Sequence, residues 1–179
     1  MYIKHIKRAL DVIISIVLII ILLPLFIFLG IVTYLSIGRP IILTEKRIGK
    51  KRKKYTIYKF RTMNFNYRIP RKKRMTKVTS FLDKYKFNEL LQLFNVLKGD
   101  MSLVGPRPFK VKHKLDKDES EERYKVRPGM TGLAQIKGTR YTDIEKKLDY
   151  DAFYSINLSF LLDLKIIFLT PIAIIKMKK

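Results

Sequence analysis

The sequence predicts an α+β fold that is mostly helical, with a Pro-kinked re-entrant membrane helix at the N-terminus, a small β-hairpin and a helical cytoplasmic domain with interfacial helices. Three patterns predict it. They are a long uncharged apolar run, two short strand-like segments on either side of a basic stretch, and apolar residues at helical spacing further along the chain. We expect a membrane-inserted segment at residues 1–38 and a cytoplasmic domain at residues 39–179 that ends in an interfacial helix.

The chain is strongly basic. Its 179 residues include 38 Lys and Arg but 15 Asp and Glu, so the formal net charge is +23. Such a surplus needs an anionic partner: acidic lipids, phosphorylated substrates or nucleic acid. The absence of cysteine excludes disulfides, thiolate zinc sites and thiol catalysis. The two histidines, His5 and His113, are far apart in sequence, which argues against a transition-metal site built by the protein alone.

Residues 12–38 carry no charge and form the membrane candidate. As a helix they would extend about 40 Å, more than the roughly 30 Å of a hydrocarbon core. Pro24 stands in the middle of this run and must break or kink the helix. Basic residues flank the run on both sides, and positive flanks prefer the cytoplasmic face. The pattern favours a helix–break–helix that enters and leaves by one face. The alternative is a bitopic span kinked at Pro24.

Two segments with strand character follow the apolar run. Residues 41–44 and 55–60 are rich in β-branched and aromatic side chains. The basic stretch 45–54, which contains Gly49, is expected to be the turn that joins them into a hairpin. The basic segment 64–77 predicts a surface loop, attracted to anionic lipid headgroups by about 1 kcal/mol per basic residue. A nucleic-acid site is the alternative for this loop, and the neighbouring apolar run disfavours it.

Apolar residues recur at helical spacing over 87–97, which predicts a helix with a wide buried face. Its polar residues share the other side and form one stripe: Asn88, Glu89, Gln92 and Asn95. A solvated face would be the simpler interpretation. In a chain this rich in Lys, however, amides are an unusual choice for such a face, which makes a hydrogen-bonded polar site the alternative.

Two arginines lie beside Pro–Gly-type turns. Arg107 stands between two prolines, and Arg127 precedes a Pro–Gly pair. A rigidly held guanidinium suits bidentate phosphate recognition, and such turns can present backbone N–H groups to an anion. Ser102 and Thr131 are nucleophile candidates in principle. Because no base is readable near them, we expect each to be a cap or a turn hydroxyl.

Two further segments complete the chain. Residues 115–122 form an acidic patch, which predicts a helix start or a surface face, with metal binding as the alternative. Residues 160–175 are apolar but are interrupted by Asp163, Lys165 and Pro171. Such a segment is too broken for a comfortable second span. We expect an interfacial helix that lies on the bilayer.

Taken in order, these motifs resemble the bacterial sugar transferases, the monotopic phosphoglycosyltransferases that act on polyprenyl phosphate. The resemblance covers nearly the whole chain. Besides the Pro-broken apolar run, it rests on the segments 59–63 (KFRTM), 89–102 (ELLQLFNVLKGDMS), 104–108 (VGPRP), 126–135 (VRPGMTGLAQ) and 161–166 (LLDLKI), together with Asp151, Tyr154 and Asn157.

The resemblance implies a two-step transfer of a sugar phosphate. An Asp of an Asp–Glu pair attacks the β-phosphate of a nucleotide sugar and releases the nucleoside monophosphate, and polyprenyl phosphate then accepts the phosphosugar. Mg²⁺ offsets the diphosphate charge. The implied location is the cytoplasmic face of the bacterial inner membrane, where the partners are the membrane, anionic lipids, nucleotide sugar and polyprenyl phosphate. Nucleic acid is not among them, and a homodimer or a partner glycosyltransferase is left open. The site positions are Glu89 and Asn88 as catalytic, Glu89 as Mg²⁺ ligand, Lys59, Arg61, Arg107, Arg127, Gln135 and Asp151 as substrate-binding, and Pro24 at the membrane break.

The sequence departs from the family at the catalytic pair. Asn88 stands where the family has its Asp, and an amide cannot form an acyl phosphate and is a poor Mg²⁺ ligand. Nearby, Asp83 replaces the usual Arg, and Lys86 replaces a common Ser. Three hypotheses stay open. One is an active phosphoglycosyltransferase in which Glu89 or another carboxylate is the nucleophile. Another is a catalytically silent relative that binds nucleotide sugar, lipid phosphate or a partner transferase. The third, which the family resemblance disfavours, is a basic membrane-surface protein that binds nucleic acid.

Overall fold

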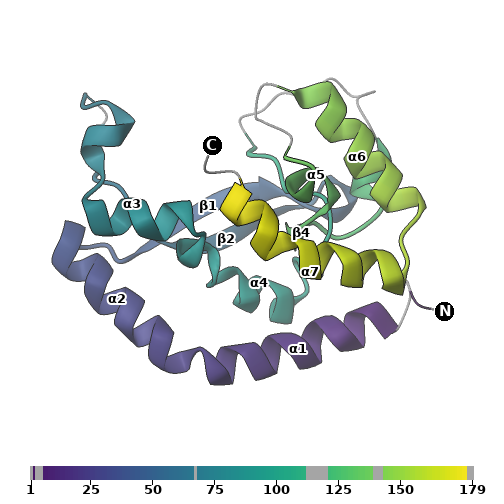
Figure 1. The fold of residues 1–179 in the computed structure, drawn as a ribbon, viewed down its shortest axis with the longest axis horizontal. Helices are drawn as coiled ribbons and strands as arrows, with labels where there is room; N and C mark the ends of the chain where they lie inside the picture. Colours follow the sequence, from purple (N-terminus) through teal and green to yellow (C-terminus); the bar gives the residue numbers. More distant parts are fainter. Residues whose placement is uncertain (1, 3–5, 67, 112–120, 139–142, 177–179) are drawn as a thin grey trace.

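The computed structural model describes residues 2, 6–66, 68–111, 121–138 and 143–176. It contains several helices, one antiparallel hairpin and one short parallel strand pair (Figure 1). The prediction of a mostly helical α+β fold with a small hairpin is therefore confirmed.

The apolar run forms two helices that meet at a bend. Helix α1 (Lys7–Ile21) and helix α2 (Leu23–Ile37) are bent by 63°. The break lies at Leu22, so Pro24 falls in the first turn of α2, where a missing N–H costs nothing within the new helix. Among the described residues, no single helix is long and apolar enough to cross a membrane, and only the bent α1–α2 pair reaches that length and composition.

The hairpin is longer than predicted. Strand β1 (Ile42–Ile48) pairs antiparallel with β2 (Lys54–Phe60), from Ile42 opposite Phe60 to Ile48 opposite Lys54. The predicted turn at 45–54 is wrong in its extent, because residues 45–48 belong to β1. Only the stretch from Gly49 to Lys53, which includes the 3₁₀ helix η2 (Lys50–Arg52), makes the turn. The charges of Glu45 and Arg47 suggested a loop, but the two side chains form an ion pair on the half-buried side of the strand.

The segment between β2 and β3 differs from the prediction in two places. Most of the loop predicted at 64–77 is irregular, but it includes the 3₁₀ helix η3 (Arg71–Arg74). Helix α3 (Lys77–Lys84) follows and is capped by Thr76. The helix predicted at 87–97 is split into the 3₁₀ helix η4 (Phe87–Glu89) and α4 (Gln92–Lys98).

A short parallel strand pair forms the centre of the C-terminal half. It joins β3 (Ser102–Val104) to β4 (Gly129–Thr131). The remaining elements are η5 (Glu121–Tyr124), α5 (Leu133–Ile136), α6 (Ile144–Ile156) and α7 (Phe160–Lys176). Glycine is required at 129, since a Cβ there would overlap the backbone of Gly105. The helix predicted at 160–175 is confirmed and continues through Pro171.

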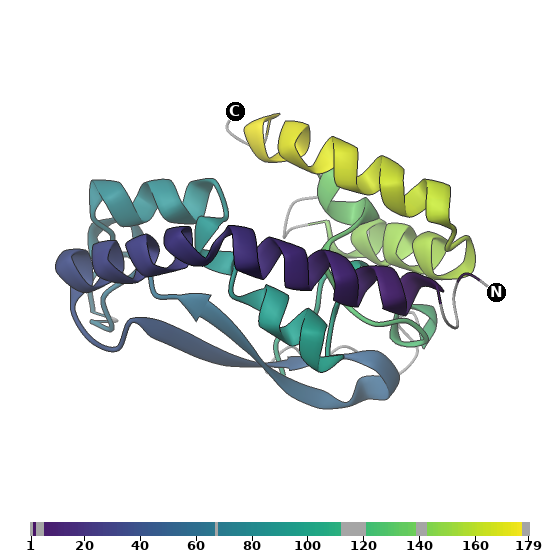
Figure 2. The ribbon, with the colours of Figure 1, turned by 90° about the horizontal axis from the view of Figure 1, so that it is seen from below.

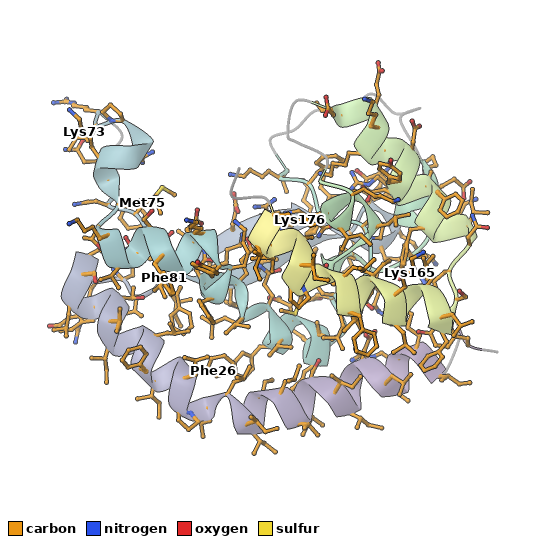
Figure 3. All side chains as sticks on the ribbon, in the orientation of Figure 1. Phe26, Lys73, Met75, Phe81, Lys165 and Lys176 are labelled. Carbon is orange, nitrogen blue, oxygen red and sulfur yellow. The ribbon has the colours of Figure 1, made fainter. Side chains whose placement is uncertain are left out.

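The elements pack around two main clusters. One joins α2, β2, α3 and α4 and includes Phe26, Leu29, Phe60, Leu82 and Leu93. The other joins β3, α5, α6 and α7 and includes Val104, Leu133, Tyr154, Leu158 and Ile166. Figure 2 shows the hairpin at one edge of the molecule and α7 at the opposite edge, with the α1–α2 arch between them in that view. In Figure 3, Phe26 lies on the side of the arch that faces α4.

Candidate active site

Two cavities lie side by side in the part of the fold between the hairpin and α7. The first, which we call the polar cavity, has a volume of about 690 Å³. Seven basic and three acidic side chains line it: Arg47, Lys59, Arg61, Arg74, Lys86, Arg107 and Lys110, with Glu45, Asp83 and Glu89. The excess of cations makes this cavity suited to an anion such as a diphosphate.

The second, which we call the apolar cavity, has a volume of about 420 Å³ and lies between α1 and α7. Its lining is dominated by aliphatic side chains: Ile14, Leu18, Leu22, Leu90, Leu93, Ile136, Ile167, Pro171, Ala173 and Ile174. Three charged residues, Lys86, Glu89 and Arg107, line both cavities and form what we call the shared wall.

Glu89 lies at the centre of the shared wall and is 9% exposed. Its Oε1 accepts hydrogen bonds from Arg107 Nη2 at 2.7 Å and from Lys59 Nζ at 3.1 Å, and its Oε2 accepts one from Gln92 Nε2 at 3.2 Å. Burial alone would raise the pKa of Glu89, but the charges of Arg107 and Lys59 outweigh burial and hold that pKa well below its usual range. Glu89 is therefore a carboxylate fixed in an ion-pair network.

Asn88 precedes Glu89 and is 5% exposed. Its Nδ2 donates a hydrogen bond to Asp83 Oδ1 at 3.3 Å, while its buried Oδ1 has no hydrogen-bond partner among the described residues. Asp83 belongs to the last turn of α3, and Lys86 takes a left-handed conformation (φ 64°) between the two elements. This tight connection brings Asp83 back beside Asn88 at the edge of the polar cavity.

The four residues of the polar stripe are all buried. Asn95 Nδ2 donates to Thr56 O at 2.7 Å, and Tyr58 N donates to Asn95 Oδ1 at 3.3 Å, so Asn95 attaches α4 to β2. The solvated interpretation of the stripe is thus wrong, and the hydrogen-bonded alternative holds. The stripe is buried because β2 and the chain around Arg107 cover this side of the segment.

Three of the predicted site residues share the polar cavity with Asn88 and Glu89: Lys59, Arg61 and Arg107. Arg61 also donates to the carbonyl oxygens of Ile37 and, at 2.8 Å, Gly38, so it holds the end of α2. Gln135 lines the apolar cavity instead.

Two predicted substrate-binding residues line neither cavity. Arg127 Nε donates to Gly99 O at 3.0 Å, at the C-terminal end of α4. Asp151 forms an ion pair of 3.0 Å with Arg123, and both side chains are almost fully buried. Burial raises the pKa of Asp151 to about 6 against the opposing charge of Arg123.

The candidate hydroxyl nucleophiles are strand residues and not caps or turn residues. The Ser102 side chain is buried in β3. Thr131, in β4, shares a hydrogen bond of 2.7 Å with the hydroxyl of Thr170 in α7.

The sequence analysis missed four charged residues of the polar cavity, namely Glu45, Arg47, Arg74 and Lys110. Glu45 accepts from Arg47 and pairs with Lys110 at 2.8 Å. Alternation along β1 was the available signal, since it places residues 43, 45 and 47 on one side of the strand.

The described residues do not fit a preformed metal site. No group of three or more His, Cys, Asp or Glu side chains in this part of the chain could hold a metal ion. The predicted Mg²⁺ ligand, Glu89, has both oxygens engaged by donors, two of them cationic. His5, His113 and residues 115–120 of the acidic patch lie outside the described residues. The patch's Glu121 pairs with Arg52 at 2.7 Å.

Comparisons with known proteins agree on one family. A family model described as bacterial sugar transferase matches residues 2–177. A sugar transferase of Bacillus subtilis is 41% identical over 170 residues, which cover 92% of this chain and 84% of the relative. A UDP-glucose:undecaprenyl-phosphate glucose-1-phosphate transferase of Klebsiella pneumoniae is 40% identical, covering 92% of this chain and 39% of the relative.

A third relative, the undecaprenyl-phosphate galactose phosphotransferase of Salmonella typhimurium, is 34% identical over 97% of this chain and 41% of its own length. The chain thus spans most of the Bacillus relative but about two fifths of the Klebsiella and Salmonella proteins.

Proposed function

Because the chain belongs to the bacterial sugar transferase family, we propose that it transfers a sugar phosphate from a nucleotide (UDP-) sugar to undecaprenyl phosphate, a polyprenyl phosphate. The reaction would start the assembly of a polysaccharide or glycoconjugate. The observation that carries the proposal is the meeting of a cationic cavity and an aliphatic cavity at Lys86, Glu89 and Arg107. A water-soluble diphosphate and a lipid phosphate are the two substrates that such a pair of cavities suits.

The polar cavity receives the nucleotide sugar in this proposal. Arg107 and Lys59 are held by Glu89 with their charges toward the cavity, and Lys86 and Lys110 line it from other elements. Their charges offset those of the diphosphate, and the guanidinium of Arg107 can bind phosphate oxygens in pairs. Because the site residues provide no metal cage, Mg²⁺ enters the proposal only as an ion that arrives bound to the diphosphate.

The apolar cavity receives the first isoprenoid units of the polyprenyl chain. Part of its wall comes from α1 and α7, and both helices also have exposed aliphatic side chains. A lipid chain can therefore pass from the bilayer into the cavity without crossing a polar surface. Its phosphate then lies at the shared wall, beside the donor.

We further propose that residues 1–38 insert into one leaflet from the cytoplasmic face and that residues 39–179 stay in the cytoplasm. The bend of 63° between α1 and α2 supports re-entry, and so do the basic residues on both sides of the pair. Exposed apolar side chains of α1, α2 and α7 would contact lipid: Ile13, Ile16, Val17, Ile20, Ile21, Leu23, Ile27, Phe28, Ile31, Leu35, Leu161, Phe168, Ile172 and Ile175. The basic segment 64–77, with Lys73 labelled in Figure 3, would bind anionic headgroups.

A second candidate function is supported by the catalytic pair itself. With an amide at position 88 and Glu89 fixed by Arg107 and Lys59, the chain would bind nucleotide sugar and polyprenyl phosphate without transferring anything. This is the catalytically silent alternative.

Release of UMP separates the two candidates. The full chain, purified in detergent or nanodiscs, is incubated with undecaprenyl phosphate, Mg²⁺ and a panel of UDP-sugars, and UMP is quantified with and without the lipid. Turnover with at least one donor supports the transferase. Donor binding with no UMP release from any member of the panel supports the silent alternative and overturns the transferase.

A further inference from the structure

The two cavities differ in how their charges are balanced. Among the described residues, ten charged side chains line the polar cavity, but only three line the apolar cavity: Lys86, Glu89 and Arg107. Arg107 Nη2 donates a hydrogen bond to Glu89 Oε1 at 2.7 Å, so these two charges offset each other. In the described wall of the apolar cavity, the positive charge of Lys86 is therefore left without a matching negative charge.

The Lys86 side chain reaches the shared wall without joining its ion pairs. Its ammonium makes no hydrogen bond or ion pair with any residue that the structure describes, whereas Lys59 and Arg107 pair with Glu89 at 3.1 and 2.7 Å. Burial raises the pKa of Glu89, and the charges of Arg107, Lys59 and, less strongly, Lys86 lower it. Lys86 thus acts on the shared wall through its charge while its ammonium stays available to a ligand.

The backbone at Lys86 is strained. Its φ of 64° and ψ of 16° lie in the left-handed region, which a residue with a Cβ rarely adopts. The connection between α3 and η4 fixes this conformation, since Lys86 O accepts a hydrogen bond from Glu89 N at 3.0 Å. Glycine would fit the same turn without strain. Because such strain is typical of functional sites, a lysine at this position points to a role for its side chain.

An unmatched ammonium at the wall of an aliphatic cavity suits an anion that has an apolar chain. The attraction is stronger there than in water, because the surroundings are weakly polar. A nucleotide sugar has no apolar chain, and the polar cavity has six basic side chains besides Lys86 to receive its diphosphate. A polyprenyl phosphate combines isoprenoid units for the aliphatic lining with a phosphate for the ammonium, and lysine binds phosphate as a point charge.

From this arrangement we propose that Lys86 binds the phosphate of the acceptor lipid and holds it at the shared wall. The inference rests on the proposed function, because that function makes a polyprenyl phosphate the second ligand. The donor diphosphate is then bound by Lys59 and Arg107, and the acceptor phosphate by Lys86. Each substrate thus has its own cation on one side or the other of Glu89.

Binding of four probes tests this assignment without requiring turnover. Farnesyl phosphate has both an isoprenoid chain and a phosphate, farnesol has the chain alone, inorganic phosphate has the anion alone, and UDP-glucose represents the donor. Each probe is titrated into the full chain, purified in a non-ionic detergent, by isothermal titration calorimetry.

Four variants separate charge from structure. Lys86→Met removes the charge and keeps an unbranched side chain, while Lys86→Arg keeps the charge. Lys86→Gly also removes the charge but relaxes the left-handed backbone, so its Tm should not fall and a loss of binding cannot be attributed to unfolding. Lys84→Met is the matched control, because Lys84 is an exposed lysine two residues away that lines neither cavity.

Lys86→Met and Lys86→Gly should weaken binding of farnesyl phosphate roughly 10- to 100-fold, the usual loss for one hydrogen bond between charged groups. Their affinity for farnesol should not change, and their loss of affinity for UDP-glucose should be several times smaller, since the other basic side chains of the polar cavity remain. Lys86→Arg should keep most of the affinity for farnesyl phosphate, and Lys84→Met all of it. The unmodified chain should bind inorganic phosphate more weakly than farnesyl phosphate.

Several results would overturn the inference. Equal losses of affinity for UDP-glucose and farnesyl phosphate would assign Lys86 to the donor. An equal loss in Lys84→Met would indicate general attraction to a basic surface, and inorganic phosphate that binds as tightly as farnesyl phosphate would indicate a site for free phosphate. Unchanged affinity of both uncharged Lys86 variants would exclude the contact altogether.

Release of UMP separates this inference from the proposed function. If the unmodified chain releases no UMP with any donor but binds farnesyl phosphate through Lys86, the transfer is overturned and the lipid-phosphate site stands. If the chain does release UMP with undecaprenyl phosphate and Lys86→Met keeps the KM for that lipid, the inference fails alone.

Discussion

Arg107 Nη2 lies 2.7 Å from Glu89 Oε1, and this contact joins the two cavities. The loop that carries Arg107 is fixed by prolines on both sides, while Glu89 belongs to η4. The positive charge of Arg107 and the negative charge of Glu89 therefore meet at the shared wall. In the proposed reaction, this is where the soluble diphosphate and the lipid phosphate would react.

Replacing Arg107 by Ala should weaken UDP-sugar binding by roughly 10- to 100-fold, since hydrogen bonds to charged groups contribute about 1.5–3 kcal/mol. Arg127→Ala is the matched control. Arg127 bonds to Gly99 O and lines neither cavity, so its loss should lower Tm and leave donor affinity unchanged. Isothermal titration calorimetry with the UDP-sugar measures the affinity of both variants, and thermal unfolding measures their Tm. Equal loss of affinity in the two variants would contradict the placement of Arg127 outside the site.

Glu89 should make the free energy of unfolding depend on pH in the acid range. Its pKa is lower in the folded chain than in the unfolded chain, so its contribution is fully present above the unfolded pKa of about 4.3 and is lost as pH falls through the folded pKa. Glu89→Gln should cost about 3–5 kcal/mol at neutral pH, because Arg107 and Lys59 lose their partner. Thermal unfolding from pH 7 downward should show the difference between the two proteins shrinking below about pH 4. A difference that is constant over this range would refute the ion-pair account.

Asp163 should hold α7 against α1. It accepts hydrogen bonds from Lys7 Nζ at 2.6 Å and from Tyr154 OH at 2.7 Å. Asp163→Asn removes the charge of a buried pair and should destabilise the chain by about 3 kcal/mol. Unfolding in detergent measures the loss, with Asp149→Asn as the surface control. A Tm equal to that of the control would show that this contact does not stabilise the packing of α7.

Filling the apolar cavity should weaken binding of the lipid substrate and leave binding of the UDP-sugar unchanged. Ala173 lines this cavity, and its neighbour Ile172 is 48% exposed on the outer side of α7. Ala173→Phe should raise the KM for undecaprenyl phosphate about 10-fold or more, by removing space for the isoprenoid units. The KM for the UDP-sugar should not change, and Ile172→Phe should alter neither constant. A rise in the KM for the UDP-sugar instead would contradict the division of the two cavities.

The topology can be tested because the chain has no cysteine. Tyr2 precedes α1 and Ser36 lies in the last turn of α2, so single cysteines at these two positions report on the two ends of the α1–α2 pair. A membrane-impermeant maleimide should label both in inverted vesicles and neither in right-side-out cells. Labelling of position 2 from the periplasm alone, with position 36 labelled from the cytoplasm, would establish a bitopic span.

Much of the local structure could be predicted from sequence. The uncharged run with Pro24 indicated two helices and a break, and alternation indicated β2 within one residue of its observed start. Phe94 shows where periodicity was insufficient. It was assigned to the buried face of the 87–97 helix but is 42% exposed and packs beside Phe26 of α2. Periodicity indicates which apolar residues share one face of a helix. It does not distinguish a face that packs against protein from a face that contacts lipid.

The sequence alone determined the charge, the apolar segments and the family resemblance, because these depend only on the composition and the order of residues. Only the tertiary structure decided which charges meet. It paired Arg107 with Glu89 and Asp83 with Asn88, and it directed Arg127 to Gly99 and Asp151 to Arg123. The reason is physical: a buried charge needs a partner within a few ångströms, and such partners come from segments that only folding brings together.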